Sequence, residues 1–334
     1  MIVKKLKFAL PFLSIVIDQM HPGWCWQLLL PLFLFFLLLL LLKRMSSATC
    51  TATAAYQALH VGQPGTLSHR IFLTKAGSNS TPLSPFHDVP LWADRDSRIA
   101  NMFVEIPRFS NAKMEISKEE WMNPVKQDVK KGQLRFVKNC FPHRGYPWNY
   151  GALPQTWESP EQVDKATGLK GDNDPIDAVE IGGRVQEPGT VIQVKILGSL
   201  ALLDEGETDW KVIVIDVTDP LAKHLNDISD LDKHCPGLLE ATRHWFRVYK
   251  VPDGKPENSF AFEGQAKDRS FTLQVIEETH EAWKGLVQKG SAQGISVANV
   301  TQSGSSFFEA NPKAIEDGQM ISLIADRNEV IHYV

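Results

Sequence analysis

The amino-acid sequence predicts an α+β protein that is mainly β, with a small barrel or curved sheet and helices packed outside it. Two runs rich in β-branched residues, at 191–203 and 210–216, are separated by the acidic stretch DEGETD and predict a hairpin. Apolar side chains recur at helical spacing over 238–249 and again over 276–287. This spacing predicts two helices late in the chain, after most of the strands.

Shorter strands precede the hairpin. The stretch MFVEIPR alternates enough for a strand that ends at Pro107, and AKMEI predicts a second short strand shortly after it. Beyond Gly290 the sequence turns rich in Ser, Gly and Asn, so we treat residues 291–334 as a poorly determined C-terminal tail. These features place one main folded domain at 45–290.

Composition narrows the classes of protein that the chain can belong to. The 334 residues carry a net charge of -4 with 43% hydrophobic content, so the chain can bury a core. The weak negative charge gives no support to nucleic acid as a general partner. Four cysteines without a CxxC pair indicate a reducing compartment, and we expect a cytoplasmic protein.

The first 44 residues differ from the rest and leave three interpretations open. The apolar run 28–42 is marginal against the ~20 residues of a spanning helix, although tryptophans precede it and Lys43 and Arg44 follow it. It could be a membrane anchor or a cleaved targeting segment, and the basic start makes a mitochondrial address an alternative. Met45 begins an ordinary soluble sequence, so residues 1–44 could also be an extension of the gene model.

Residues 171–177 read GDNDPID and raise the question of what three closely spaced aspartates do. Asp and Pro are typical of turns, so turn chemistry alone could account for Asp172, Asp174 and Asp177. An EF-hand is excluded because the fifth and sixth positions counted from Asp172 are Ile and Asp. A catalytic Mg²⁺ site remains open, provided that the acidic hairpin loop folds beside this stretch.

Cationic side chains occur among the acids. Lys113 and Glu115 are two residues apart on a predicted strand, so they point to one face, and Asp209 and Lys211 repeat this arrangement. Arg135 lies within the apolar stretch LRFV. Each lysine or acid alone is typical of a solvated surface, whereas the apolar neighbours of Arg135 would direct its guanidinium group inward. Together with the acids, these cations fit a site for metals and phosphate.

Motifs for several other chemistries are absent from the sequence. It contains no G-x-x-x-x-G-K-[ST], no G-x-G-x-x-G and no G-x-S-x-G. A P-loop nucleotide site, a Rossmann cofactor site and a serine hydrolase therefore have no support.

GDNDPID resembles the D-x-D-P-x-D signature of the soluble inorganic pyrophosphatases. Further blocks resemble the eukaryotic, long-chain type in the same order along residues 69–290: SPFHDVPLWAD, VEIPRFSNAKMEI, GQLRFVKNCFPHRGYPWNYGALPQTWE, LLDEGETDWKVIVID and WFRVYKVPDGKPENSFAF. The resemblance implies an OB-like five-stranded barrel with helices outside. It implies hydrolysis of diphosphate to two orthophosphates with Mg²⁺ as cofactor, a catalytic domain at 45–290, and a homodimer.

The resemblance also implies a set of metal ligands. Asp172, Asp177 and Asp209 would bind the first metals, with Asp177 bridging them. Asp204 would join Asp209 on a metal that arrives with the substrate, and Glu115 would hold another through water.

Catalytic and substrate-binding roles follow from the same resemblance. Asp174 would accept a proton from the nucleophilic water, Tyr146 would lie near the leaving group, and Arg135 would act on the reacting phosphates. Glu105 falls at a further active-site position. The substrate would be held by cationic and hydroxyl side chains: Lys113, Arg135, Tyr150, Lys211, Tyr249 and Lys250.

Two rival functions stay open at this point. A non-catalytic scaffold that binds metal or partners need not retain both the acidic and the basic residues, which are all present. A phosphotransferase acting on nucleotides lacks a P-loop or an adenine-site motif. A membrane becomes a partner only if residues 1–44 are retained.

Overall fold

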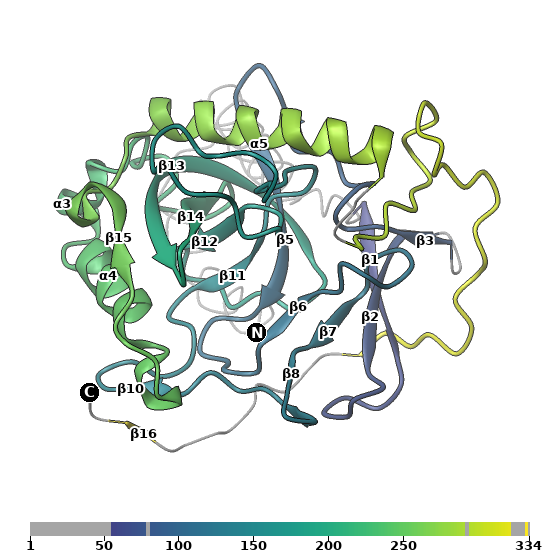
Figure 1. Cartoon of the computed structure of the whole chain (residues 1–334), viewed down its shortest axis with the longest axis horizontal. Helices are drawn as coiled ribbons and strands as arrows, with labels where there is room; N and C mark the ends of the chain where they lie inside the picture. The colour runs from purple at the N-terminus through teal and green to yellow at the C-terminus, as the bar shows by residue number, and fades with distance from the viewer. Residues whose placement is uncertain (1–54, 78–80, 291–293, 322–330, 333–334) are drawn as a thin grey trace, which may run out of the picture. The chain divides into compact units, whose positions relative to one another are not determined.

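A computed structural model of the chain describes residues 55–77, 81–290 and 294–321, together with the backbone of 331–332 (Figure 1). The N-terminal segment 1–44, for which three interpretations were left open, lies outside these residues. None of the helices within the described ranges is both long and apolar enough to cross a membrane.

Five strands pair into a closed ring. Its order is β13, β14, β12, β11, β5 and back to β13, and every pairing is antiparallel except that of β12 with β14. This ring confirms the OB-like five-stranded barrel. The strands are β5 (Ile99–Ile106), β11 (Asn149–Ala152), β12 (Asp177–Glu180), β13 (Val191–Asp204) and β14 (Glu207–Asp216).

The predicted hairpin is the longest pairing in the barrel. Strands β13 and β14 pair from Val194 opposite Asp216 to Asp204 opposite Glu207, with a shift of register between Ile196 and Gly198. The two turn residues, Glu205 and Gly206, have φ angles of 51° and 95°. Positive φ at both positions matches the twist of a two-residue hairpin turn, and glycine takes the second position at little cost. The turn therefore fixes where Asp204 lies relative to β14.

Both faces of the barrel strands are buried, and consecutive residues alternate between two apolar clusters. On β14, Val212 and Val214 belong to one cluster with Met102 of β5. Ile213 and Ile215 belong to the other, which includes helical side chains such as Trp245. Covering both faces explains why the strands read as almost continuous apolar runs in the sequence.

A second sheet packs against the barrel and shares the larger apolar cluster. It contains β1 (Tyr56–Val61), β2 (Arg70–Lys75), β3 (Pro82–Leu83), β6 (Met114–Ile116) and β7 (Val125–Gln127). Two short strands extend the barrel sheet: β4 (Trp92–Asp94) and β15 (Ser259–Phe260). Two small ladders pair β8 (Val129–Lys130) with β9 (Gln133–Leu134), and β10 (Asn139–Cys140) with β16 (Ile331–His332).

Both predicted helices form, and a short helix that was not predicted, α3 (Asp230–His234), precedes them. Helix α4 (Leu238–Val248) follows Gly237, whose φ of 82° favours glycine. Helix α5 (Arg269–Lys289) begins earlier than its apolar spacing predicted, because the Asp268 side chain caps it by accepting a hydrogen bond from the Phe271 amide at 2.8 Å. Short 3₁₀ turns occupy Val251–Asp253 and Ala261–Gly264.

The segment 294–321 runs along the end of α5 and the second sheet (Figure 1). Ile295 and Val297 are buried within the larger apolar cluster. Asp88 accepts hydrogen bonds from the amides of Val300 and Thr301, at 2.8 and 2.9 Å. These contacts attach this part of the C-terminal region to the body of the protein.

The buried His87 connects its own loop to helix α5 and to the segment 294–321. His87 is fully buried, its Nδ1 accepts a hydrogen bond from the Trp283 indole at 3.0 Å, and its Nε2 lies 3.0 Å from the Ser296 carbonyl. Both contacts are made by a neutral ring that carries its proton on Nε2. Burial lowers the pKa of His87 from its ordinary 6.5 to about 4.

We therefore expect His87 to make folding pH-dependent. Between pH 6.5 and 4 the unfolded chain binds a proton at His87 and the folded chain does not, so stability falls as the pH is lowered. The free energy of unfolding should drop by up to about 3 kcal/mol more in the unchanged chain than in His87→Gln. Urea titrations at several pH values measure this, and parallel curves for the two proteins would contradict it.

Candidate active site

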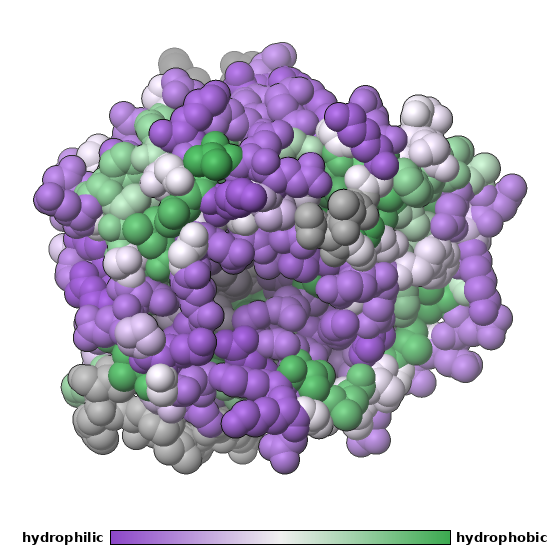
Figure 2. Space-filling view, viewed as in Figure 1, coloured by the Kyte–Doolittle hydropathy of each residue, from purple (hydrophilic) through white to green (hydrophobic). Residues whose placement is uncertain are grey.

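One cavity of about 190 Å³ collects every site residue that the sequence indicated. Figure 2 shows that the face of the molecule over the barrel is hollowed and that hydrophilic side chains surround the hollow. The residues concerned are Glu105, Lys113, Glu115, Arg135, Tyr146, Tyr150, Asp172, Asp174, Asp177, Asp204, Asp209, Lys211, Tyr249 and Lys250.

Strand pairing brings the two acidic stretches together. The parallel register of β12 and β14 sets Asp177 beside Lys211, and a bridge between Gly171 and Thr208 joins the GDNDPID stretch to the hairpin. Asp209 lies between these two contacts on β14. The convergence that a magnesium site required is therefore present in the fold.

The GDNDPID stretch is a tightly held turn. A Cβ on Gly171 would lie 2.3 Å from the main-chain carbon of Glu158, so only glycine fits. Asn173 has a φ of 72°, and its side-chain oxygen accepts a hydrogen bond from the Trp157 indole at 3.1 Å. Asp172 accepts one from the Asp174 amide at 3.0 Å. The aspartates thus shape the turn while their carboxyl groups line the cavity.

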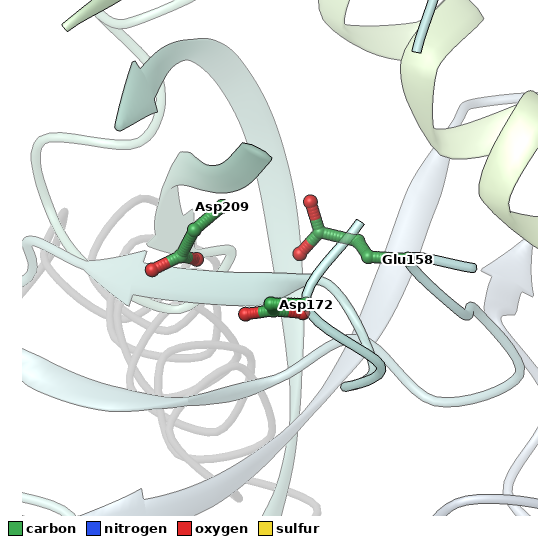
Figure 3. A group of neighbouring side chains, drawn as sticks. All are labelled: Glu158, Asp172 and Asp209. Atoms are coloured by element: carbon green, nitrogen blue, oxygen red, sulfur yellow. The ribbon is translucent and has the colours of Figure 1, made fainter. Parts of the chain in front are cut away.

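Asp172 and Asp209 line one side of the cavity, and Glu158, which is not among the lining residues, crowds against them. Oxygen atoms of Glu158, Asp172 and Asp209 lie within 4.8 Å of one another, and the side chains point toward a common space (Figure 3). Burial, together with the neighbouring carboxylates, raises the pKa of Glu158 and Asp172 well above the ordinary range. Burial raises the pKa of Asp209 to about 7, although Lys211 opposes the shift. A cation would relieve this crowding.

A buried lysine offsets part of the negative charge. Lys211, with 3% of its side chain exposed, pairs with both Asp177 and Asp209. Burial alone would lower the pKa of Lys211, but the two carboxylates raise it well above its ordinary value. Lys211 therefore stays charged inside the protein.

The other cations of the cavity also pair with acids. Lys250 lies 2.6 Å from Asp204, at the point where α4 ends beside the hairpin, and Lys113 pairs with Glu115 on β6. Such partners hold the ammonium groups at the cavity wall. The oxygen atoms of a bound polyanion can take the place of these carboxylates as partners of the ammonium groups.

Buried hydroxyl groups complete the wall. Tyr150 donates a hydrogen bond to Asp177, and its hydroxyl oxygen accepts one from Lys211 at 3.0 Å. Burial raises the pKa of Tyr146, Tyr150 and Tyr249 above the ordinary value, so all three remain protonated donors.

Glu105 lies deeper, at the end of β5, where only 6% of it is exposed. Its carboxyl group accepts a hydrogen bond from the Ile116 amide at 2.7 Å. Burial and then the charge of Asp177 raise the pKa of Glu105 well above its ordinary value. Glu105 therefore connects β5 to β6 behind the cavity.

Three charged residues near the cavity were missed from sequence. Glu158 belongs to the carboxyl group cluster, Lys118 lies 2.7 Å from Asp174, and Asp128 lies 2.9 Å from Arg135. Lys118 follows Glu115 by three residues in a charged stretch that looked like an ordinary surface. Glu158 reaches the site because its backbone pairs with Asn173 and Asp174, a long-range contact without a local signal.

Known proteins that are similar to this chain in sequence or fold are pyrophosphatases. The family model of the inorganic pyrophosphatases matches residues 102–284. The inorganic pyrophosphatase of Emericella nidulans is 58% identical over 261 residues, which cover 78% of this chain and 90% of that protein. The inorganic pyrophosphatase of Drosophila melanogaster is 50% identical over 288 residues, which cover 84% of this chain and 85% of that protein.

Solved structures agree with the sequence matches. The inorganic pyrophosphatase of Schistosoma japonicum superposes with a TM-score of 0.78 at 50% identity, covering 83% of this chain and all of that one. An N-terminally truncated vacuolar soluble pyrophosphatase of Trypanosoma cruzi in complex with PPi superposes with a TM-score of 0.64 at 41% identity. The match covers 72% of this chain and 95% of that one. With its barrel and with identities of 50% or more to eukaryotic relatives, the chain belongs to the inorganic pyrophosphatase family, in its eukaryotic type.

Proposed function

We propose that the chain hydrolyses diphosphate to two orthophosphates. The observation that carries this proposal is the cavity in which acidic, cationic and phenolic side chains converge. Family membership supports it, as does the T. cruzi relative in complex with PPi. These findings do not favour a non-catalytic scaffold.

Diphosphate fits this cavity by charge. The proposed substrate-binding residues carry ammonium, guanidinium and hydroxyl groups, which are donors to phosphate oxygens. In the structure Lys250 pairs with Asp204, and Lys113 with Glu115. We infer that substrate and metal together replace these pairs, since phosphate oxygens attract the lysines and a cation attracts the carboxylates. The proposed substrate-binding set is Lys113, Arg135, Tyr150, Lys211, Tyr249 and Lys250.

The acidic side of the cavity fits a hard divalent cation, and we propose Mg²⁺. Crowded, buried carboxylates with raised pKa values are oxygen donors of the type that Mg²⁺ prefers. When bound, Mg²⁺ supplies charge neutralisation at phosphate oxygens and increases the acidity of coordinated water. The proposed ligands are Asp172, Asp177, Asp209, Asp204 and Glu115.

Asp174 is the proposed proton acceptor for the attacking water. It lines the cavity next to Asp172, and Lys118 lies 2.7 Å from its carboxylate. This ion pair fixes the position of the Asp174 carboxylate, whose oxygen atoms are proton acceptors. We propose that Tyr146 and Arg135 act at the phosphates, with the leaving group near the Tyr146 hydroxyl, and that Glu105 supports the cavity from below.

We further propose that 45–290 is the catalytic domain, that the protein is cytoplasmic, and that it forms a homodimer. The homodimer rests on the family resemblance, and we propose the exposed Phe109, with 55% of it accessible, for its interface. An exposed aromatic side chain of this kind is typical of interfaces. A molar mass from light scattering tests the homodimer.

The function is tested by phosphate release from diphosphate. We expect rapid release with Mg²⁺ and loss of release when a chelator removes it, because the crowded carboxylates then repel the substrate. The full chain and a protein that begins at Met45 should behave alike if residues 1–44 are dispensable for chemistry. A folded protein that releases no phosphate with Mg²⁺ would favour the scaffold.

Asp174→Asn should lower kcat by about 100- to 10,000-fold, the usual contribution of a positioned general base. The amide is nearly isosteric with the carboxylate, so the circular dichroism spectrum and melting temperature should stay close to those of the unchanged chain. Asp96→Asn, at an exposed position, is the matched control and should keep full activity. An unchanged kcat for Asp174→Asn would remove this residue from catalysis.

Arg135→Lys should lower kcat/KM by about tenfold, because a planar fork that can bind two oxygens becomes a point charge. Arg95→Lys serves as control, since the Arg95 side chain is 61% exposed and pairs only at 3.4 Å with Glu277. Steady-state kinetics at saturating Mg²⁺ give both values. Equal kcat/KM values for the two variants would show that the guanidinium group of Arg135 does not bind the phosphate oxygens of the substrate.

A further inference from the structure

Two histidines meet outside the catalytic cavity. His143 lies in the loop between β10 and β11, and His244 lies on α4. The Nε2 atom of His143 is 2.9 Å from the Nδ1 atom of His244, and the rings are tilted by 42°. Both residues are partly exposed, and the proposed hydrolysis uses neither of them.

A carboxylate lies one helical turn before His244. Glu240 precedes His244 by four residues, which places both side chains on one face of α4. The carboxylate is held by Arg243, with Nη2 at 2.7 Å and Nε at 3.0 Å. Because 64% of the Glu240 side chain is exposed, it has room to rotate toward the histidines, and the rotation exchanges its two hydrogen bonds with Arg243 for the metal ion.

The geometry of the pair is close to that of two ligands on one ion. Zinc–nitrogen distances of about 2.0–2.1 Å in a tetrahedral site set two ring nitrogens roughly 3.3 Å apart. The observed 2.9 Å is a hydrogen bond between the two nitrogens, so a metal ion would replace its proton, and the pair would open and turn its rings toward the ion. Burial and then the nearby His244 lower the pKa of His143, so its ring is neutral at neutral pH, the form that binds metals.

We propose that His143, His244 and Glu240 form a binding site for a divalent transition-metal ion, with Zn²⁺ as the ligand. Two imidazoles and a carboxylate are a donor set that suits zinc, whereas Mg²⁺ prefers oxygen alone. The site is distinct from the carboxylate cavity and does not depend on the proposed hydrolysis.

Occupancy would join two segments that both lead to the cavity. The loop of His143 continues to Tyr146, and α4 ends beside Tyr249. These segments already touch, since the Trp245 indole donates a hydrogen bond to the Gly145 carbonyl at 2.9 Å. A zinc ion at the pair would add a second connection at the surface end of the same contact.

The experiment is a Zn²⁺ titration of the full chain in excess Mg²⁺, followed by calorimetry and by the ring ¹⁵N signals of the histidines. We expect the signals of His143 and His244 to shift together. The variant His143→Gln keeps an amide that can contact His244 but removes a ligand. Its zinc affinity at this site should fall at least about tenfold, or 1.4 kcal/mol.

The matched control is His224→Gln. His224 stacks on His234 with ring centroids 5.4 Å apart, so it belongs to another histidine pair on the described surface. This variant should bind zinc as the unchanged chain does. Ring signals of His143 and His244 that do not move, or equal isotherms for His143→Gln and the unchanged chain, would overturn the proposal.

Two variants test the third ligand while both histidines stay in place, one at the half-buried Arg243 and one at the exposed Glu240. Arg243→Ala frees the Glu240 carboxylate and removes a positive charge, so zinc should bind about three- to tenfold tighter. Glu240→Gln should weaken binding by a similar factor. Unchanged affinity in both variants would exclude Glu240 and overturn the three-ligand site.

Discussion

The arrangement of the cavity depends on the burial of Lys211 between Asp177 and Asp209. Two carboxylates at the centre of the site repel each other strongly in a poorly solvated space, and the ammonium group between them offsets that repulsion. The parallel pairing of β12 with β14 sets Asp177 beside Lys211. The unusual strand direction in an otherwise antiparallel ring is therefore what gives the acids a common cation.

The same compensation extends outward from Lys211. Among the other carboxylates of the cavity, Asp204 has Lys250 and Asp174 has Lys118 as its own cation, and Asp172 belongs to the crowded group. The buried Glu105 instead accepts a hydrogen bond from the Ile116 amide. The crowded group is the part of the wall in which negative charge exceeds positive charge most clearly. A metal ion would restore the balance there, while the paired lysines lie where phosphate oxygens can reach them.

Several strands, both long helices and most residues of the cavity could be predicted from the sequence. The features that were missed at the site depend mainly on contacts between distant parts of the chain. The hairpin, the strand ending near Pro107 and the two helices follow from periodicity, which is local. The identity of the site residues came from motif resemblance, because spacing alone left Asp172 open to turn chemistry. Glu158 was missed because its position depends on backbone pairing with Asn173 and Asp174, far along the chain, which no local pattern encodes. Helix α5 begins early because an N-cap, not an apolar position, sets its start.

Turn formation and metal binding are not competing explanations for GDNDPID. Asp172 accepts the Asp174 amide in the turn, and one carboxylate has lone pairs left after such a bond. Gly171 lets the backbone press against Glu158, and Trp157 fixes Asn173 from behind. The turn therefore holds three carboxyl groups in place before any ligand arrives. Such preorganisation is what electrostatic stabilisation of a highly charged reaction requires, because little has to move as charge develops.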